Sequence, residues 1–343
     1  MTPHGVFLYT IHQACATVRV LRNAIIADMT HAKTNLFKRV FKGLQVLLLV
    51  AAFVLMGYLL RKDFQAEQFQ TLLQQASFAW LGLALLAAFL GLLFKVQRLK
   101  EMAQVFGLPI SFRQSFDIQV ISISLGIITP GRAGELSKVF LMTETRPEAR
   151  KKALGLMIIE RLMDMLVLAC LGGAFLLSWQ WSGFVYGLLA LGSVVAFLAF
   201  FRFWPLLKSV VSAKMSVARL NPGHGLRWLG LSALAWIFDG LFQGCILASV
   251  GFFPDVIKLV ALNALVAIAG VLSLLPVGLG TVDLSALYLY SHTFQLEQST
   301  IVYLLAAGRV LGLGLLFTLM GLVLLKHPGL YQRLKKRQKQ EAD

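Results

Sequence analysis

Long runs of apolar residues, separated by short polar stretches, dominate the sequence. Six runs are long enough to cross about 30 Å of hydrocarbon, which takes about 20 helical residues. Because a helix satisfies its own backbone polar groups within one segment, each run predicts a membrane-spanning α-helix. The six expected spans lie near residues 43–60, 78–95, 153–178, 183–201, 228–250 and 301–325.

Two further apolar segments are interrupted and predict a different structure. Residues 114–141 are broken at Pro130 and Gly131, and residues 256–290 are broken across the sequence PVGLG at 276–280. Proline lacks a backbone N–H and its ring clashes with the carbonyl four residues earlier, so a helix opens there. At 1.5 Å per residue, the part after each break is too short for a full crossing. We therefore expect two re-entrant helical hairpins.

The distribution of Lys and Arg supports this topology, because these residues collect in cytoplasmic loops of membrane proteins. With both hairpins re-entrant, the expected cytoplasmic pieces, which include residues 95–113 as a loop, hold 25 of the 32 basic residues. One more crossing in either hairpin would exchange the sides of the later loops and remove the bias. Both chain termini are then expected to be cytoplasmic. The basic residues left inside membrane segments are Arg132, Lys138, Arg161 and Arg309.

The same order of elements occurs twice, in residues 43–178 and in residues 183–325. Each part has two spans, a hairpin and a third span, and the second part has the opposite orientation. In such an inverted-topology repeat, paired Gly/Pro-interrupted segments indicate a transport site. The fold class predicted is all-α: a polytopic membrane protein with six full spans, two re-entrant hairpins and an inverted repeat. The expected hairpin breaks are Pro130, Gly131, Gly134, Pro276, Gly278 and Gly280.

Composition agrees with an integral membrane protein, since 58% of residues are hydrophobic and 14% are charged, against about 25% charged in a soluble domain. The six His and three Cys residues show no metal or redox spacing. No P-loop motif for ATP occurs either. We expect neither a metal nor a cofactor. The net charge of +16 is explained by membrane topology, so we expect no nucleic-acid partner.

The chain divides into three parts on this interpretation. Residues 43–325 form the transmembrane domain, between a cytoplasmic N-terminal extension at 1–42 and a basic cytoplasmic tail at 326–343. The first 28 residues lack the early positive charge and the apolar core of a signal peptide. Met29 is then either the native start, or the residues before it form a loosely held extension.

Ionisable residues inside the expected membrane segments are the candidates for function. Each costs at least about 2.5 to 3.5 kcal/mol near the bilayer centre, so it should face the protein interior or a wet cavity. Helical spacing allows Arg161 to contact Asp164 and places Glu160 on the same face. Glu160 has no local partner, and it needs Arg132, Arg309 or a ligand cation. The ten such residues are Asp117, Arg132, Glu135, Lys138, Glu160, Arg161, Asp164, Asp239, Asp283 and Arg309.

The break at Pro130 predicts a site for an anion such as phosphate. A half-helix that restarts near Arg132 would direct free N–H groups and its positive dipole end into a cavity. Arg132 would add a bidentate contact to the phosphate. Glu135 either caps this helix or binds a cationic part of the substrate. Asp117 and Lys138 lie nearer the cytoplasmic end, where an interfacial position is expected.

The second hairpin offers a similar set of residues. Thr281 is expected to be the N-cap of its second helix, with Asp283 in the first turn. Arg309 is the expected partner of Asp283 or of phosphate. Asp239 is isolated in the sequence, and both a hydrogen-bonded interior acid and a proton-sensitive group fit it.

Four segments in this order, TPGRAGELSKVFLM, ERLMDMLVL, LPVGLGTVD and AAGRVLGLGL, resemble the lysylphosphatidylglycerol synthase transmembrane family, a flippase-like domain. The resemblance covers about residues 43–325 and implies translocation of a polar lipid. No synthase activity is implied, because the family's soluble aminoacyl-transferase domain is absent here, and Asp283 stands where the family's glutamate is expected. The motif positions matched are Arg132, Glu135, Arg161, Asp164 and Arg309.

The leading hypothesis is a flippase or scramblase of the bacterial cytoplasmic membrane for an anionic or aminoacylated phospholipid. Alternatives are a carrier of polyprenyl-phosphate-linked sugars and a non-transporting partner of a lipid synthase. An intramembrane enzyme is disfavoured because no nucleophile has an adjacent base. Membrane lipids are the expected partners, and a homo-oligomer is compatible with the sequence. The expected substrate-binding residues are Arg132, Glu135, Glu160, Arg161, Asp164, Asp239, Asp283 and Arg309.

Overall fold

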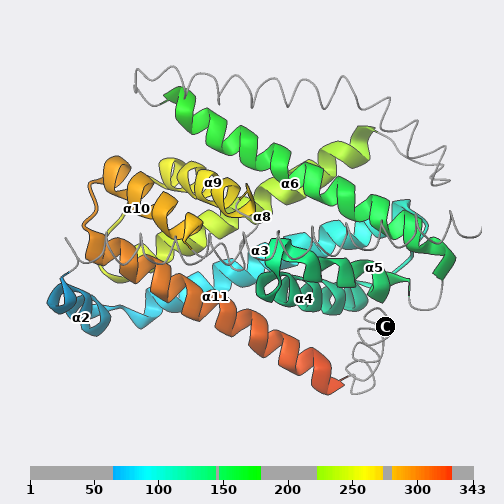
Figure 1. The fold of residues 1–343 in the computed structure, drawn as a ribbon, viewed down its shortest axis with the longest axis horizontal. Coiled ribbons are helices and arrows are strands. Elements are labelled where there is room, and N and C mark those ends of the chain that lie inside the picture. Colours follow the sequence, from blue (N-terminus) through cyan, green and yellow to red (C-terminus); the bar gives the residue numbers. More distant parts are fainter. Residues whose placement is uncertain (1–64, 144–146, 179–221, 273–279, 327–343) are drawn as a thin grey trace, which may run out of the picture. The chain divides into compact units, whose positions relative to one another are not determined.

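A computed structural model describes residues 65–143, 147–178, 222–272 and 280–326. All of them belong to one compact unit, Leu55–Asp343. Within these ranges every regular element is a helix, so the all-α prediction is confirmed for the described part of the chain (Figure 1). The expected extension at 1–42 and the tail after Lys326 lie outside the described residues.

Eleven helical elements follow one another in the described ranges. The elements of the first half are α2 (Ala66–Gln75), α3 (Phe78–Val105), α4 (Phe112–Ile128), η1 (Pro130–Leu136), α5 (Ser137–Met142), η2 (Pro147–Ala149) and α6 (Arg150–Ser178). Those of the second half are α8 (Pro222–Ser249), α9 (Val256–Leu272), α10 (Thr281–Phe294) and α11 (Gln298–Lys326).

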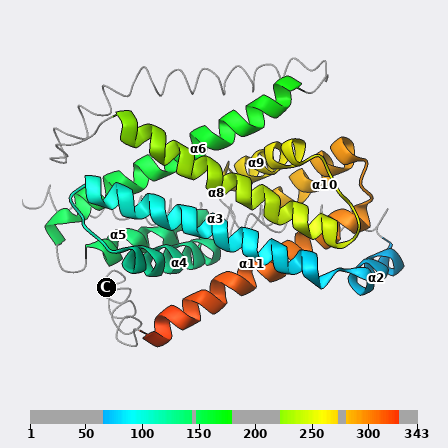
Figure 2. The ribbon, with the colours of Figure 1, turned by 180° about the vertical axis from the view of Figure 1, so that it is seen from behind.

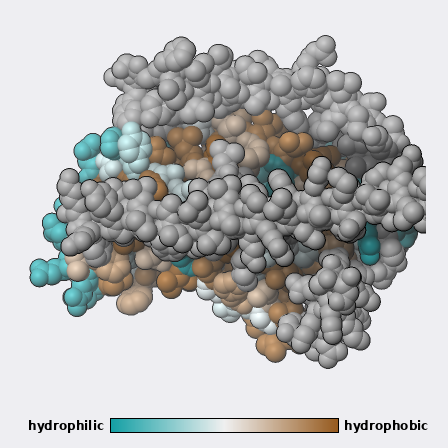
Figure 3. All heavy atoms as spheres, viewed as in Figure 1, coloured by the Kyte–Doolittle hydropathy of each residue, from teal (hydrophilic) through white to brown (hydrophobic). Residues whose placement is uncertain are grey.

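Three of the described helices, α3, α8 and α11, are long and apolar enough to cross a membrane. Helices α3 and α11 contain the spans expected at 78–95 and 301–325, and α8 contains the span expected at 228–250 except for its last residue. Helix α6 has 29 residues and contains the span expected at 153–178, but it carries several charges. In Figure 3, apolar side chains cover much of the visible described surface, and polar ones gather where α2 lies. The spans expected at 43–60 and 183–201 lie outside the described residues, so six spans remain a prediction.

Helix α3 corrects one expected boundary. The expected span ended at residue 95, with a cytoplasmic loop at 95–113, whereas the helix continues to Val105. The sequence after Lys95 contains no Pro or Gly before Gly107, so nothing interrupts the helix. Its apolar positions Leu99 and Met102 are fully buried. One face of residues 95–105 is therefore part of the packed interior.

Helices α3 and α8 form the central contact of the unit, although they are far apart in the sequence. They run antiparallel, side by side (Figure 2). Ala84 near one end of α3 packs in the same buried cluster as Ile246. Farther along, a Cβ on Gly91 would lie 3.3 Å from the Ala235 carbonyl oxygen. This close approach of two backbones leaves room only for small residues at the crossing.

The first hairpin reverses the chain direction at Thr129. Helix α4 starts with a capping box, in which Ser111 accepts from the Gln114 N–H and the Gln114 side chain accepts from the Ser111 N–H. After Thr129, η1 and α5 return alongside α4. The expected α-helix near Arg132 is instead a seven-residue 3-10 helix, and α-helix resumes only at Ser137. Arg132 itself has φ 57°, in the left-handed region.

The second hairpin consists of α9 and α10, which pack against each other. Gly280 precedes α10 with φ 83° and occupies the N-cap. The expected N-cap at Thr281 is therefore wrong by one residue. The Gly280 N–H donates to Asp283 Oδ2 at 2.9 Å, so the Asp283 carboxylate binds the backbone N–H of the N-cap residue. The expected breaks at Pro276 and Gly278 lie outside the described residues.

We predict that Gly134→Ala destabilises the first hairpin. A Cβ at Gly134 would overlap the backbone carbonyl of Leu125 and lie 2.8 Å from the Gly126 nitrogen, and backbone atoms cannot move aside as flexible side chains can. The expected loss is about 1–3 kcal/mol, observed as a lower melting temperature in detergent. Gly314→Ala is the control, because nothing lies within 4 Å of its added Cβ. An equal melting temperature for the two variants would contradict the prediction.

Candidate functional site

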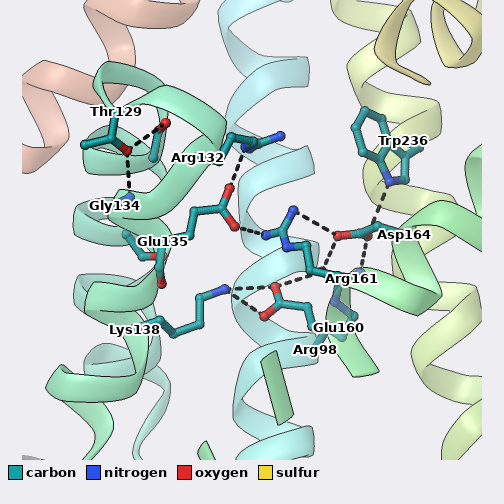
Figure 4. A network of polar contacts seen from close by, with 12 residues as sticks. Arg98, Thr129, Arg132, Gly134, Glu135, Lys138, Glu160, Arg161, Asp164 and Trp236 are labelled. Atoms are coloured by element: carbon teal, nitrogen blue, oxygen red, sulfur yellow. Dashed lines mark hydrogen bonds and ion pairs between the residues drawn. The ribbon is translucent and has the colours of Figure 1, made fainter. Parts of the chain in front are cut away.

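Seven charged side chains meet where the first hairpin packs on α3 and α6 (Figure 4). They form a buried layer of four residues and a partly exposed layer of three. The buried layer contains Arg98, Lys138, Glu160 and Asp164, and the partly exposed layer contains Arg132, Glu135 and Arg161.

The buried layer pairs every charge within it. Arg98 Nη1 lies 2.5 Å from Asp164 Oδ1, and Arg98 Nη2 lies 2.9 Å from Glu160 Oε1. Lys138 Nζ donates to both Glu160 oxygens, at 2.9 and 2.7 Å. Ser232 accepts a further hydrogen bond from Arg98. Two cations balance two carboxylates, as removal from water requires of buried charges.

The partly exposed layer has an excess of positive charge. Glu135 lies between two arginines: Arg132 Nε is 2.6 Å from its Oε1, and Arg161 forms an ion pair with its Oε2. The side chains of Arg132 and Arg161 are 40% and 31% exposed, against 5% for Glu135. Two cations and one carboxylate leave one positive charge in excess. This excess lies on the outward-facing part of the network.

Backbone geometry corrects the predicted anion site at the helix restart. The Gly134 N–H donates to Thr129 Oγ1 at 2.6 Å, and the Arg132 N–H donates to the Thr129 carbonyl at 3.2 Å. Thr129 thus binds N–H groups that were expected to face a ligand, and a seven-residue 3-10 helix supplies little dipole. Positive potential at this site comes from side chains.

The sequence interpretation missed two members of the network. Arg98 was assigned to a cytoplasmic loop, yet it is 1% exposed at the centre of the cluster. Lys138 was placed at the interface, yet it is fully buried. These two residues, rather than Arg132, Arg309 or a ligand cation, are the partners of Glu160. The unbroken helical pattern beyond Lys95 was the signal that could have revealed Arg98.

Local spacing predicted the contact of Arg161 with Asp164 within α6 correctly. It did not identify the partners of Glu135 in the hairpin. Arg161 Nη1 lies 3.8 Å from Asp164 Oδ2, as the three-residue spacing predicted. Glu135 was expected to cap a helix or to bind a substrate cation, but its carboxylate pairs with Arg132 and Arg161. Trp236, which the sequence interpretation did not consider, donates to Asp164 at 3.3 Å.

A second, smaller cluster lies at the second hairpin. Arg309 Nη2 is 2.6 Å from Asp283 Oδ1, which confirms the expected pairing. The exposed fractions are 30% for Arg309 and 1% for Asp283. The pair repeats the pair of Arg161 and Glu135, since in both a hairpin acid binds an arginine of the next long helix. Asp283 lies 148 positions after Glu135, and Arg309 lies 148 positions after Arg161.

The remaining candidate, Asp239, belongs to neither cluster. It is half-buried on α8 and accepts a hydrogen bond from Asn263 at 3.4 Å. Among the described residues, no ion pair or hydrogen bond joins the first cluster to the pair of Asp283 and Arg309. A pocket shared by the two hairpins therefore remains a prediction. The described residues also contain no group of three metal-ligating side chains.

We predict that Arg98→Met destabilises the protein far more than Arg227→Met. Loss of Arg98 leaves Asp164 without its closest cation and Glu160 with one partner fewer, and breaking a buried pair costs about 3–5 kcal/mol. Arg227 also pairs with an acid, Glu101 at 2.8 Å, but it is 67% exposed, where such a pair contributes about 0–1 kcal/mol. Thermal unfolding and folded yield in detergent measure the difference. Similar losses in both variants would show that the buried layer does not support the fold.

The sequence matches the model of a known protein family. Residues 44–321 match the family model described as the lysylphosphatidylglycerol synthase TM region. None of the curated proteins compared with the chain matches it. The matched range contains both charged clusters and most of the sequence. The chain therefore belongs to the lysylphosphatidylglycerol synthase TM region family.

Proposed function

We propose that this protein translocates a polar lipid across the bacterial cytoplasmic membrane, as a flippase or scramblase. Its substrates in this proposal are anionic or aminoacylated phospholipids. Family membership supports a role connected with membrane lipids. The observation that carries the proposal is the pair of partly exposed arginines, Arg132 and Arg161, on either side of Glu135.

The chemistry of these arginines suits a phosphodiester. A guanidinium group presents parallel N–H donors that match two phosphate oxygens. Glu135 pairs with both arginines, and in this proposal a phosphate replaces it at one of them. The excess positive charge of this layer favours that exchange. The buried layer beneath fixes Arg161, because Asp164 also binds Arg98.

We further propose that the two halves form an inverted repeat. The packing of the described helices supports this, because it is reciprocal. The first-half hairpin helix α4 packs on α11, and the second-half hairpin helix α9 packs on α6. Helices α3 and α8 pack mainly on each other. Such repeats commonly move substrates by rocking one half against the other around a central site.

The membrane arrangement belongs to the same proposal. Six spans, two re-entrant hairpins and two cytoplasmic termini would let a headgroup pass the clusters while the acyl chains stay in the bilayer. Transport then requires no chemical reaction at the site, so the protein acts without enzymatic activity. In this proposal, another gradient or another protein supplies the direction of transport.

We predict that Arg132→Gln lowers lipid transport at least about tenfold. The variant removes a charge-assisted contact worth about 1.5–3 kcal/mol, and about 1.4 kcal/mol corresponds to a factor of ten. Purified protein is reconstituted into liposomes with fluorescent phosphatidylglycerol, and the rate at which the label becomes accessible to a membrane-impermeant quencher is measured. Arg227→Gln is the control, since it removes an exposed arginine from an ion pair outside the clusters. Equal rates for both variants, or no transport by the wild-type protein, would refute the proposal.

We predict that Arg309→Gln also lowers transport, by a similar factor. Its guanidinium is partly exposed, like that of Arg161, while its partner Asp283 is buried. Arg309→Lys, which keeps the charge but loses the fork, is expected to restore part of the rate. The same liposome assay measures both variants. Unchanged transport in Arg309→Gln would limit the site to the first hairpin.

A further inference from the structure

A cavity of about 110 Å³ lies between α3, α4, α8 and α11. Its volume exceeds the ~30 Å³ that one water occupies in the liquid. Most of its wall is apolar, with Leu92, Ile123 and Phe242 among the lining residues. The two ionisable residues that line it, Lys95 and Asp239, carry opposite charges. Neither belongs to the charged clusters described above.

The two charges line one cavity without pairing with each other. Lys95 Nζ lies 5.1 Å from the centre of the Trp236 ring. Among the described residues, Asp239 accepts a hydrogen bond only from Asn263, at the long distance of 3.4 Å. Neither forms an ion pair with any residue that the structure describes. A cation–π contact is weaker than a desolvated ion pair. The cavity thus offers one site for an anionic group and one for a cationic group.

The proposed repeat explains why space remains at this position. A shift of 148 residues, which relates Arg161 to Arg309, also relates Asp164 to Gly312. The same shift relates Trp236 to Ala88. On the α6 side, Trp236 and Asp164 bind each other. On the α11 side, the two equivalents are small residues that line the cavity.

We propose that this cavity binds a zwitterionic lipid headgroup, with its phosphate at Lys95 and its ammonium group at Asp239. The assignment rests on the proposed function for the ligand being a lipid. It concerns a binding site separate from the arginine layer that we propose for anionic or aminoacylated phospholipids. The apolar wall accommodates the carbon atoms that separate the two charged groups. Trp236 connects this site with the first cluster, since its ring contacts Lys95 and its indole N–H binds Asp164.

The test is calorimetric titration of the purified full chain in detergent. The probes are dihexanoyl phosphatidylethanolamine, dihexanoyl phosphatidylglycerol and free phosphoethanolamine. The wild-type protein is expected to bind the phosphatidylethanolamine about tenfold more tightly than the phosphatidylglycerol. Asp239→Asn should remove this preference, whereas Lys95→Gln should weaken the binding of both lipids. Lys100→Gln, the same change on the same helix outside the cavity, should leave binding unchanged.

A further variant fills the cavity and keeps both charges. A Cβ at Gly312 would meet only the Phe242 ring, at an ordinary distance of 3.7 Å, so Gly312→Leu is expected to fold. It should weaken the binding of phosphatidylethanolamine at least about tenfold. This variant tests the site even if the removal of a charge prevents folding.

Three results would overturn the proposal. They are equal binding of the two lipids by the wild-type protein, an unchanged preference in Asp239→Asn, and unchanged affinity in Gly312→Leu. Binding of free phosphoethanolamine as tightly as the lipid would overturn the assignment to a lipid. Titration does not require transport, so its result is separate from the liposome assay. Failed transport with intact binding would refute only the proposed function.

Discussion

Charges removed from water must be paired, and this constraint organises the centre of the molecule. Arg98 contacts Asp164 and Glu160 from 66 and 62 residues away in the sequence. Arg98 thereby joins α3 to α6. Lys138 joins the first hairpin to α6 through Glu160. Each partner left alone would be an uncompensated buried charge. The four buried charges therefore fix how the hairpin, α3 and α6 lie against one another.

Small residues allow the close backbone packing that positions the charged side chains. Gly134 lets the returning leg of the hairpin touch the backbone of α4, and Gly91 lets α3 approach α8. These contacts bring Glu135 to a position between Arg132 and Arg161. The arginine layer that we propose as the phosphate site is thus a product of close backbone packing. It does not depend on the free N–H groups of a helix terminus, which Thr129 binds instead.

In the inverted repeat that we propose, some features occur in both halves and others in one half only. An acid of the hairpin pairs with an arginine of the following long helix in both halves. Glu160 and Asp164 have no acidic counterparts in the second half, because the positions 148 residues later are Gly308 and Gly312. The first half therefore holds a dense charge network. The second half has open space at the corresponding place, where the cavity with Lys95 and Asp239 lies.

The sequence by itself determined the helical class, the positions of three apolar spans, the break at Pro130 and the contact of Arg161 with Asp164, because each depends on local spacing or on the length of an apolar run. It also indicated the pairing of Arg309 with Asp283. Only the tertiary structure decided that Arg98 and Lys138 are the partners of Glu160, that Thr129 accepts from the Gly134 N–H in the hairpin turn, and that Lys95 and Asp239 line one cavity. Contacts between helices distant in the chain depend on how those helices rotate and pack. No local pattern records that packing.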